Sequence, residues 1–163
     1  MRVIDSENRI IEDSWERFVP DQDEAAPEEG DIIVPYSYWQ KNREQLLRRS
    51  GRLGVSILGD SDIAGLAADV GRLALIAIEF PEFKDGRLYS QARLLKERFG
   101  YTGELRAVGD VLRDQLFYMR RCGVDSFEVR SDRDIEDALA GLADFSVTYQ
   151  SAGDGRLPLF RQR

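Results

Sequence analysis

A regular alternation of short apolar runs and amphipathic stretches begins near residue 54 and constrains the fold more than any other feature of this sequence. Period-two or continuous apolar runs predict strands, and apolar positions three and four apart predict helices. The expected strands are 55–58, 73–80, 104–108 and 124–129, with a last one at 145–149. The expected helices are 60–70, 86–99, 110–122 and a stretch from about 132, with Ser131 as its cap. Residues 73–80 are almost entirely apolar, which is typical of a strand covered on both faces.

Strands and helices that alternate every roughly 20–30 residues predict parallel βαβ units with right-handed crossovers. The predicted class is therefore α/β. Four such units form either half of a (β/α)₈ barrel or a small open parallel sheet, and the pattern favours neither. A half-barrel leaves sheet edges that the N-terminal segment or a second subunit must cover, so a homodimer is one expectation.

The first 35 residues have a different character. Residues 1–19 alternate short apolar pairs with polar residues around a turn at 6–8, which predicts a short N-terminal β-hairpin. Residues 20–31 combine two prolines with clustered acids, which is typical of a solvated linker. We therefore expect a hairpin and acidic linker over residues 1–35, followed by an α/β domain over residues 36–163.

A brief strand is expected at the end of the linker, over residues 31–34, and a helix after Pro35. Ser37 and Gln40 have the spacing of a capping box, in which each side chain satisfies a free backbone donor. The helix should extend to about Ser50, where glycines follow.

Composition excludes several classes of chemistry. The chain has no histidine, which removes the usual general base, the serine and cysteine triads and the commonest metal ligand. Cys122 is the single cysteine, so no internal disulfide can form and a cysteine-based metal cluster is not expected. Phosphate-loop and dinucleotide-binding fingerprints are also absent from the sequence, so we expect no resident cofactor and no metal.

The net charge and the hydropathy pattern limit the binding partners and the cellular location that we expect for this protein. The net charge is −7 and the pI about 4.8, which argues against a nucleic-acid partner because such proteins present a basic surface. The longest apolar run, 73–78, is too short to cross a bilayer, and no leader with a charged and then an apolar region opens the chain. A cytoplasmic location without a membrane partner is the expectation.

The first candidate site follows the strand 73–80. Asp85, Gly86 and Arg87 stand at the expected start of a helix, where a cap, a close backbone approach and a cation together suit an oxyanion. The alternative is an ordinary turn and helix cap. Tyr89, one turn along, is a weaker candidate as a proton donor.

The second candidate site follows the strand 104–108. Gly109 and Asp110 precede Arg113 and Asp114, and a helix would bring these charged side chains together near one end. They could form an anion- or ligand-binding cluster, or simply a capped helix with a surface ion pair.

Arg106 lies within the same strand, between the apolar Leu105 and Ala107, so its charge needs a partner. Consecutive parallel strands are usually adjacent, which makes Glu79 at the end of the preceding strand the expected partner. Such a pair would be structural or would line a polar pocket.

Two segments of the chain resemble the signature of a bacterial domain-of-unknown-function family, number nine hundred and thirty-four in that series. They are residues 83–95, FKDGRLYSQARLL, and residues 103–116 with 121–123. Members of that family are often labelled as oxidoreductases of sulfite reduction, because they are encoded beside the sulfite reductase haemoprotein. The resemblance implies the pathway of assimilatory sulfite reduction and sulfite reductase as a partner. It implies no catalytic residue.

Three hypotheses follow. The first is a non-catalytic accessory of sulfite reductase: a stabiliser, an assembly factor or an electron-delivery adaptor. The second is an enzyme on a barrel-like scaffold that acts on a sulfur oxyanion or borrows a flavin or nicotinamide. The third is an anion-binding or sensing module. A pocket that unites Arg87, Arg106 and Asp110 would favour the second or third, whereas arginines held in local ion pairs would favour the first.

Overall fold

The fold is that of a computed structural model, which describes residues 1–21, 24–59, 61–80 and 86–143. The strands in these residues are β1 (Arg2–Ile4), β2 (Ile10–Glu12), β3 (Glu16–Arg17), β4 (Ile32–Pro35), β5 (Leu53–Ile57), β6 (Leu75–Phe80), β7 (Glu104–Gly109) and β8 (Ser126–Phe127). The α-helices are α1 (Tyr36–Leu47), α2 (Arg87–Arg93), α3 (Arg113–Arg121) and α4 (Ile135–Ala143). Two 3₁₀ turns, η1 (Ile63–Leu66) and η2 (Val70–Arg72), and a π-helical turn, η3 (Leu94–Arg98), complete the elements.

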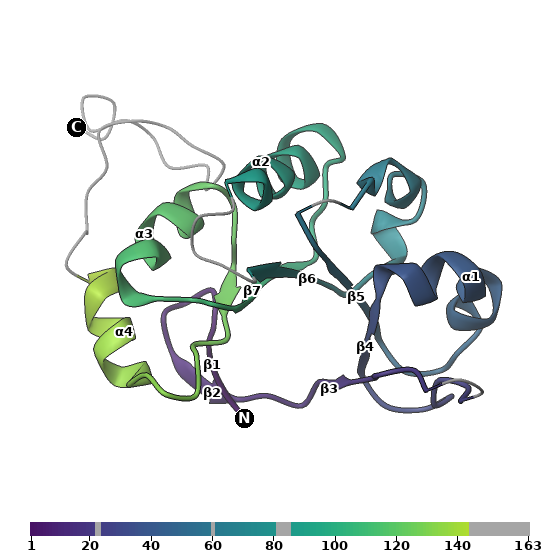
Figure 1. Ribbon diagram of the computed structural model, residues 1–163, viewed down its shortest axis with the longest axis horizontal. Coiled ribbons are helices and arrows are strands. Elements are labelled where there is room, and N and C mark those ends of the chain that lie inside the picture. Colours follow the sequence, from purple (N-terminus) through teal and green to yellow (C-terminus); the bar gives the residue numbers. More distant parts are fainter. Residues whose placement is uncertain (22–23, 60, 81–85, 144–163) are drawn as a thin grey trace.

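All eight strands belong to one mixed sheet with the order β2-β1-β8-β7-β6-β5-β4-β3. Strands β3 to β8 are parallel, while β1 pairs antiparallel with both β8 and β2. The sheet curves into a half-barrel, with α1, α2 and α3 above it in Figure 1. The α/β class, the parallel units and the N-terminal hairpin are therefore confirmed, and the half-barrel replaces the open sheet.

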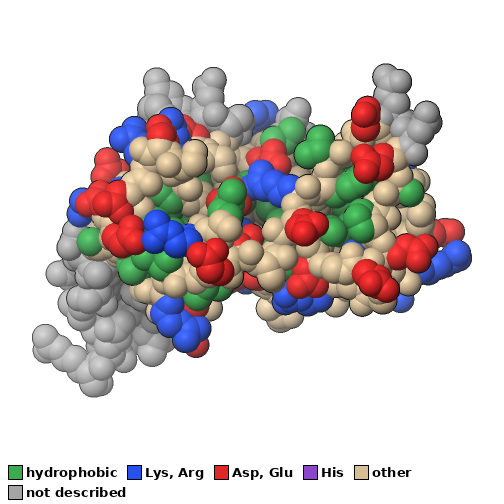
Figure 2. All heavy atoms as spheres, turned by 90° about the horizontal axis from the view of Figure 1, so that it is seen from below, with side chains coloured by type: hydrophobic (Ala, Val, Ile, Leu, Met, Phe, Trp, Pro, Cys, Tyr) green, Lys and Arg blue, Asp and Glu red, His purple; other side chains and the backbone are tan. Residues whose placement is uncertain are grey.

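The N-terminal segment runs beneath the sheet and joins its two edges (Figure 1). Strands β2 and β3 are the outermost strands, yet only residues 13–15 separate them in sequence. We call residues 13–17 the strap. Because the hairpin extends the sheet beyond β8 and β3 extends it beyond β4, the chain itself covers both edges of the parallel strands. Viewed from below, this side shows acidic, basic and apolar side chains interspersed (Figure 2).

Hydrophobic packing occurs on both faces of the sheet. Ile76, Ile78 and Phe80 of β6 belong to the large core between sheet and helices, whereas Leu75 and Ala77 belong to a small cluster on the other face. The small cluster also contains Ile33 and Val108, and Trp15 of the strap packs against it. The prediction that β6 is covered on both faces is confirmed.

The helix predicted at 60–70 does not form as an α-helix; η1 and η2 take its place. The apolar spacing of this segment favours an α-helix, but its contacts with α1 hold it in another conformation. The Asp69 carboxylate is buried and accepts two hydrogen bonds from Arg43 of α1, at 2.6 and 2.7 Å. The Tyr36 hydroxyl donates to the Asp62 carbonyl, and a Cβ on Gly65 would lie 2.8 Å from that hydroxyl oxygen.

The predicted capping box does not form. Helix α1 begins at Tyr36 with Pro35 as its N-cap, and no side chain accepts a hydrogen bond from its first turn. Ser37 therefore lies inside the first turn, two positions after the N-cap and too late to cap the helix. Proline suits a helix start because its φ is fixed and it has no N–H to satisfy.

The later helices also begin after their predicted starts. Helix α3 starts at Arg113 because Leu112 is extended. The cap of α4 is Asp134, whose carboxylate accepts from the backbone N–H of Glu136 at 2.9 Å, so the assignment of Ser131 was wrong. The strand expected at 145–149 lies outside the described residues. No helix in the described part of the chain has the length and apolarity needed to cross a membrane.

Candidate functional site at the carboxyl ends of the strands

A cleft of about 510 Å³ lies at the carboxyl ends of β3, β7 and β8. Its lining includes Arg17 at the end of β3, Gly109 at the end of β7 and residues 128–133, which follow β8. We call it the mouth cleft. Functional groups of barrel-like α/β folds collect at this end of the strands, because the loops that vary leave the sheet there.

Gly109 shapes the floor of the mouth cleft. Its φ is +88°, and a Cβ would lie 2.6 Å from the Phe80 carbonyl oxygen, so this position requires glycine. The following N–H, that of Asp110, donates to the same carbonyl at 2.6 Å. This tight turn holds the Asp110 carboxylate at the cleft, where it accepts a hydrogen bond from Arg130 at 2.7 Å.

Each of two arginines at the cleft lies against a less exposed carboxylate. Arg130 pairs with Asp110 and also with Asp132, at 2.8 Å. Arg17 pairs with Glu128 at 3.0 Å. The Asp110 and Glu128 side chains are 17% and 15% exposed, against 38% and 42% for their arginines. The hydrogen bonds that Arg130 donates to Asp110 and Asp132 raise the pKa of its guanidinium, so its charge is fixed at any physiological pH.

Sequence reasoning missed Arg17, Glu128 and Arg130. The signal for the last two was present: they lie within three residues after the end of β8, just as Asp110 lies after the end of β7. Arg17 had no such signal, because its place beside β8 depends on the strap crossing the sheet.

Arg106 lies on the lower face of the sheet, where the strap crosses it, rather than at the mouth cleft. Its side chain is 2% exposed, and its guanidinium donates to Asp13 at 2.8 Å, to Glu104 at 2.8 and 3.1 Å and to Ser126 at 3.3 Å. Burial lowers the pKa of Arg106, but Glu104 and Asp13 outweigh it and raise the pKa overall. The need for a buried partner is confirmed.

The predicted pairing of Arg106 with Glu79 is wrong. The register of the two strands places Arg106 beside Ala77, and Glu79 beside Val108, nearer the carboxyl ends. The partners Glu104 and Asp13 lie toward the amino ends, so the Arg106 side chain extends away from Glu79. The half-buried Glu79 is thus not part of the charged network around Arg106.

Arg113 does not join Asp110 in the expected cluster. It pairs with Asp137 of α4 at 2.8 Å and so links α3 to α4, while Asp110 pairs with Arg130. The helix begins at Arg113, so Asp110 precedes it and the helical spacing does not apply.

The first candidate site is also dispersed. Asp85 lies outside the described residues. Gly86 has φ −66° with open space around its Cβ position, and Arg87 begins α2. Tyr89 packs between Phe80 and Tyr118, with ring centroids 5.4 and 4.9 Å apart, and burial raises the pKa of its hydroxyl. Tyr89 is thus part of an aromatic cluster on the helix side of the sheet.

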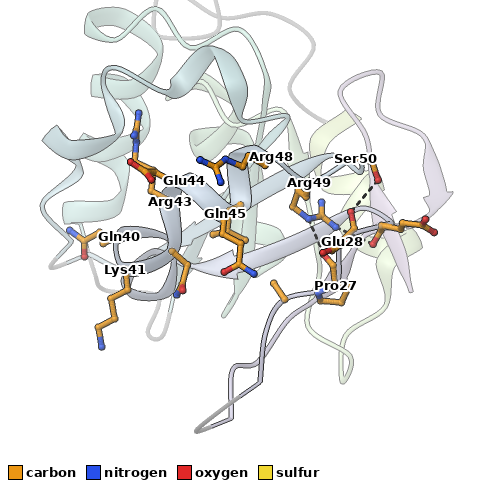
Figure 3. A pocket seen from close by; sticks show the side chains of 14 residues that line it. Pro27, Glu28, Gln40, Lys41, Arg43, Glu44, Gln45, Arg48, Arg49 and Ser50 are labelled. Atoms are coloured by element: carbon orange, nitrogen blue, oxygen red, sulfur yellow. Dashed lines mark hydrogen bonds between the residues drawn. The ribbon is translucent and has the colours of Figure 1, made fainter.

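A second groove, of about 800 Å³, lies between α1 and residues 26–29 of the acidic linker (Figure 3). Arg49 holds the linker there by donating to the carbonyls of Pro27, Glu29 and Gly30 at 2.9 to 3.1 Å. Ser50 donates to the carbonyl of Glu28. The groove lies where the chain enters β4 and β5, at their amino ends, which in barrel-like folds serve stability more than chemistry.

The chemistry available at the mouth cleft is that of anion recognition. Its cations are guanidiniums, which bind oxyanions through paired N–H donors. Among the described residues, no three carboxylate or thiol side chains lie close enough together to hold a metal ion.

Comparison with known proteins identifies one family. The family described as bacterial protein of unknown function (DUF934) matches residues 54–160, from the start of β5 through α4 and beyond. No curated protein and no solved structure matches the chain. Since the match covers more than half of the sequence, the chain belongs to this family of bacterial proteins of unknown function.

Proposed function

We propose that the protein is an accessory of assimilatory sulfite reduction that supports sulfite reductase by direct protein interaction. The pathway is inferred from the family, whose members are often labelled as proteins of sulfite reduction. The accessory role is inferred from the contacts of the candidate site residues.

One observation carries the preference for an accessory over an enzyme. Two of the three arginines predicted to bind an anion, Arg106 and Arg113, hold the scaffold together instead. Arg106 is buried and binds the strap through Asp13, and Arg113 links α3 to α4 through Asp137. These cations therefore lie on different faces of the fold and form no shared pocket.

Charge supports docking to a basic partner. The net charge is −7, and the linker carries several of the acids. Glu28 and Glu29 have exposed side chains, while their backbone carbonyls are fixed by Ser50 and Arg49. Exposed carboxylates on an anchored segment steer association with a positive surface, and that contribution weakens with salt.

The test is co-expression and co-purification with sulfite reductase, followed by sulfite turnover with and without this protein. We expect a complex and higher turnover or a larger yield of active reductase. Unchanged binding and turnover would refute the proposal. Sulfite turnover by the isolated protein would instead support the alternative, an oxidoreductase or sulfur-oxyanion-binding enzyme.

A charge-matched pair of variants sharpens the test. Glu28→Gln with Glu29→Gln removes two exposed linker carboxylates without touching the carbonyls that hold the linker. Asp114→Asn with Glu97→Gln removes two exposed carboxylates from helical segments that do not line the groove beside the linker. If the linker docks, only the first pair slows association at low salt; equal slowing by both pairs would point to net charge alone.

A further inference from the structure

The mouth cleft concentrates positive charge in a protein whose net charge is −7. Four guanidiniums line it: Arg2 from β1, Arg17 from the end of β3, and Arg130 and Arg133 from the loop between β8 and α4. Arg2 pairs with Glu136 of α4 at 2.6 Å, so the other three are the candidates for binding a ligand. These come from segments more than 100 residues apart in sequence, brought together by the strap. The lining also includes two carboxylates, Glu128 and Asp132.

The carboxylates orient the arginines without exhausting their donors. A guanidinium has five N–H donors. Arg17 donates one of its N–H groups to Glu128. The Glu128 carboxylate is the more buried partner, so the Arg17 guanidinium remains at the surface of the cleft. Arg130 is held from two sides by Asp110 and Asp132. For the exposed Arg133, the structure describes no side-chain ion pair among residues 1–21, 24–59, 61–80 and 86–143.

The backbone of the cleft is equally fixed. Gly109, in a left-handed conformation against Phe80, lines the cleft and sets the position of Asp110 beneath Arg130. A pre-oriented guanidinium loses less conformational entropy on binding than a free one, which is the usual requirement of an anion site on a protein surface.

We propose that the mouth cleft binds an oxyanion of the sulfate, sulfite or phosphate type through Arg17, Arg130 and Arg133. A cleft of about 510 Å³ is larger than a bare tetrahedral ion, so the oxyanion is either free or carried on a small molecule. The proposal concerns the isolated protein and goes beyond the interaction with sulfite reductase; either can fail without the other.

The experiment is titration of the isolated protein with sodium sulfate, sulfite, inorganic phosphate and glycerol phosphate at constant ionic strength, with chloride as the balancing anion. Two-dimensional NMR follows the backbone amides. We expect saturable shifts at Gly109 and at residues 129–133, with a Kd of about 1 mM or tighter for at least one anion. Tighter binding of glycerol phosphate than of inorganic phosphate would indicate a carried oxyanion; the reverse would indicate a free one.

Two variants with the same change in charge locate the site. Arg133→Gln removes the exposed guanidinium of the cleft, and Arg48→Gln removes an exposed guanidinium in the groove beside α1. We expect Arg133→Gln to weaken binding roughly three-fold or more, as for loss of one exposed ion pair, and Arg48→Gln to leave it unchanged. No saturable shift with any anion, an unaltered Kd in Arg133→Gln, or equal weakening in both variants would overturn the proposal.

Discussion

The pair between Arg106 and Asp13 makes the strap a structural requirement, and Asp13→Asn tests this. The Arg106 side chain is 2% exposed and that of Asp13 is 8% exposed. Removing one charge from a buried pair costs about 3–5 kcal/mol, because the remaining ion stays desolvated without its full compensation. Glu104 still accepts two hydrogen bonds from Arg106 and partly compensates its charge, so we expect a smaller loss of about 2–3 kcal/mol.

Urea unfolding at pH 7 measures this loss directly. For a chain of this length the same change lowers Tm by about 5–10 °C. The control is Glu12→Gln at the neighbouring position, whose side chain is 78% exposed and whose ion pair spans 3.5 Å. It should change the free energy of unfolding by less than about 0.5 kcal/mol. If Asp13→Asn were no more destabilising than Glu12→Gln, the strap would not depend on the buried pair.

A compensating variant separates the lost charge from lost packing. Asp13→Leu combined with Arg106→Met and Glu104→Gln removes the buried pair and the second carboxylate that Arg106 binds, and keeps apolar volume between the strap and the sheet. Replacing a whole buried pair by apolar residues is often neutral, whereas breaking it is not. The triple variant should therefore be more stable than Asp13→Asn, and a lower stability would contradict the electrostatic account.

Two further predictions concern backbone and pH. Gly109→Ala should lower the free energy of unfolding by about 2–4 kcal/mol, measured in urea, because φ is +88° and the new Cβ would lie 2.6 Å from the Phe80 carbonyl oxygen. The control is Gly86→Ala, at φ −66° with open space around the Cβ position, which should change the free energy of unfolding by less than about 0.5 kcal/mol. Equal losses in the two variants would refute the reasoning. The hydrogen bonds from Arg43 lower the pKa of Asp69, so this ion pair stabilises the fold above about pH 4 and is lost as the pH falls through the folded-state pKa. Asp69→Asn should thus be less stable than the unaltered protein at pH 7, with a gap that narrows toward pH 3; a gap that stays constant would show that its charge is not responsible.

Much of the fold was predictable because hydrophobic periodicity reports burial. The continuous apolar run of β6 indicated a strand with two covered faces, and Leu75 and Ile76 do face opposite clusters. Curvature was not predictable, since a half-barrel and an open sheet share the same local pattern. The half-barrel is accompanied by the strap, whose Trp15 packs against the small cluster on the lower face of the sheet through contacts that no local spacing reveals.

The candidate site was only partly predictable for the same reason. Glu104 was within reach of sequence reasoning, because side chains two apart in a strand share a face with Arg106. Asp13 was not, since it is 93 residues away and reaches Arg106 only when the strap is in place. Gly109 and Asp110 were correctly expected at a strand end. Arg113 was placed with them on the assumption of a helix from residue 110, but α3 begins only at Arg113, three residues later.

The position of β1 has a consequence for synthesis on the ribosome. Ile4 pairs with Phe127, so the hairpin made first must wait for a strand made roughly 120 residues later. At 5–20 residues per second, this interval is on the order of 6–25 s. Throughout it, Val3 and Ile4, which are fully buried in the finished fold, lack the strand that covers them. The nascent chain therefore carries an exposed apolar hairpin until β8 has been synthesised, which makes the hairpin a natural place for a chaperone to bind.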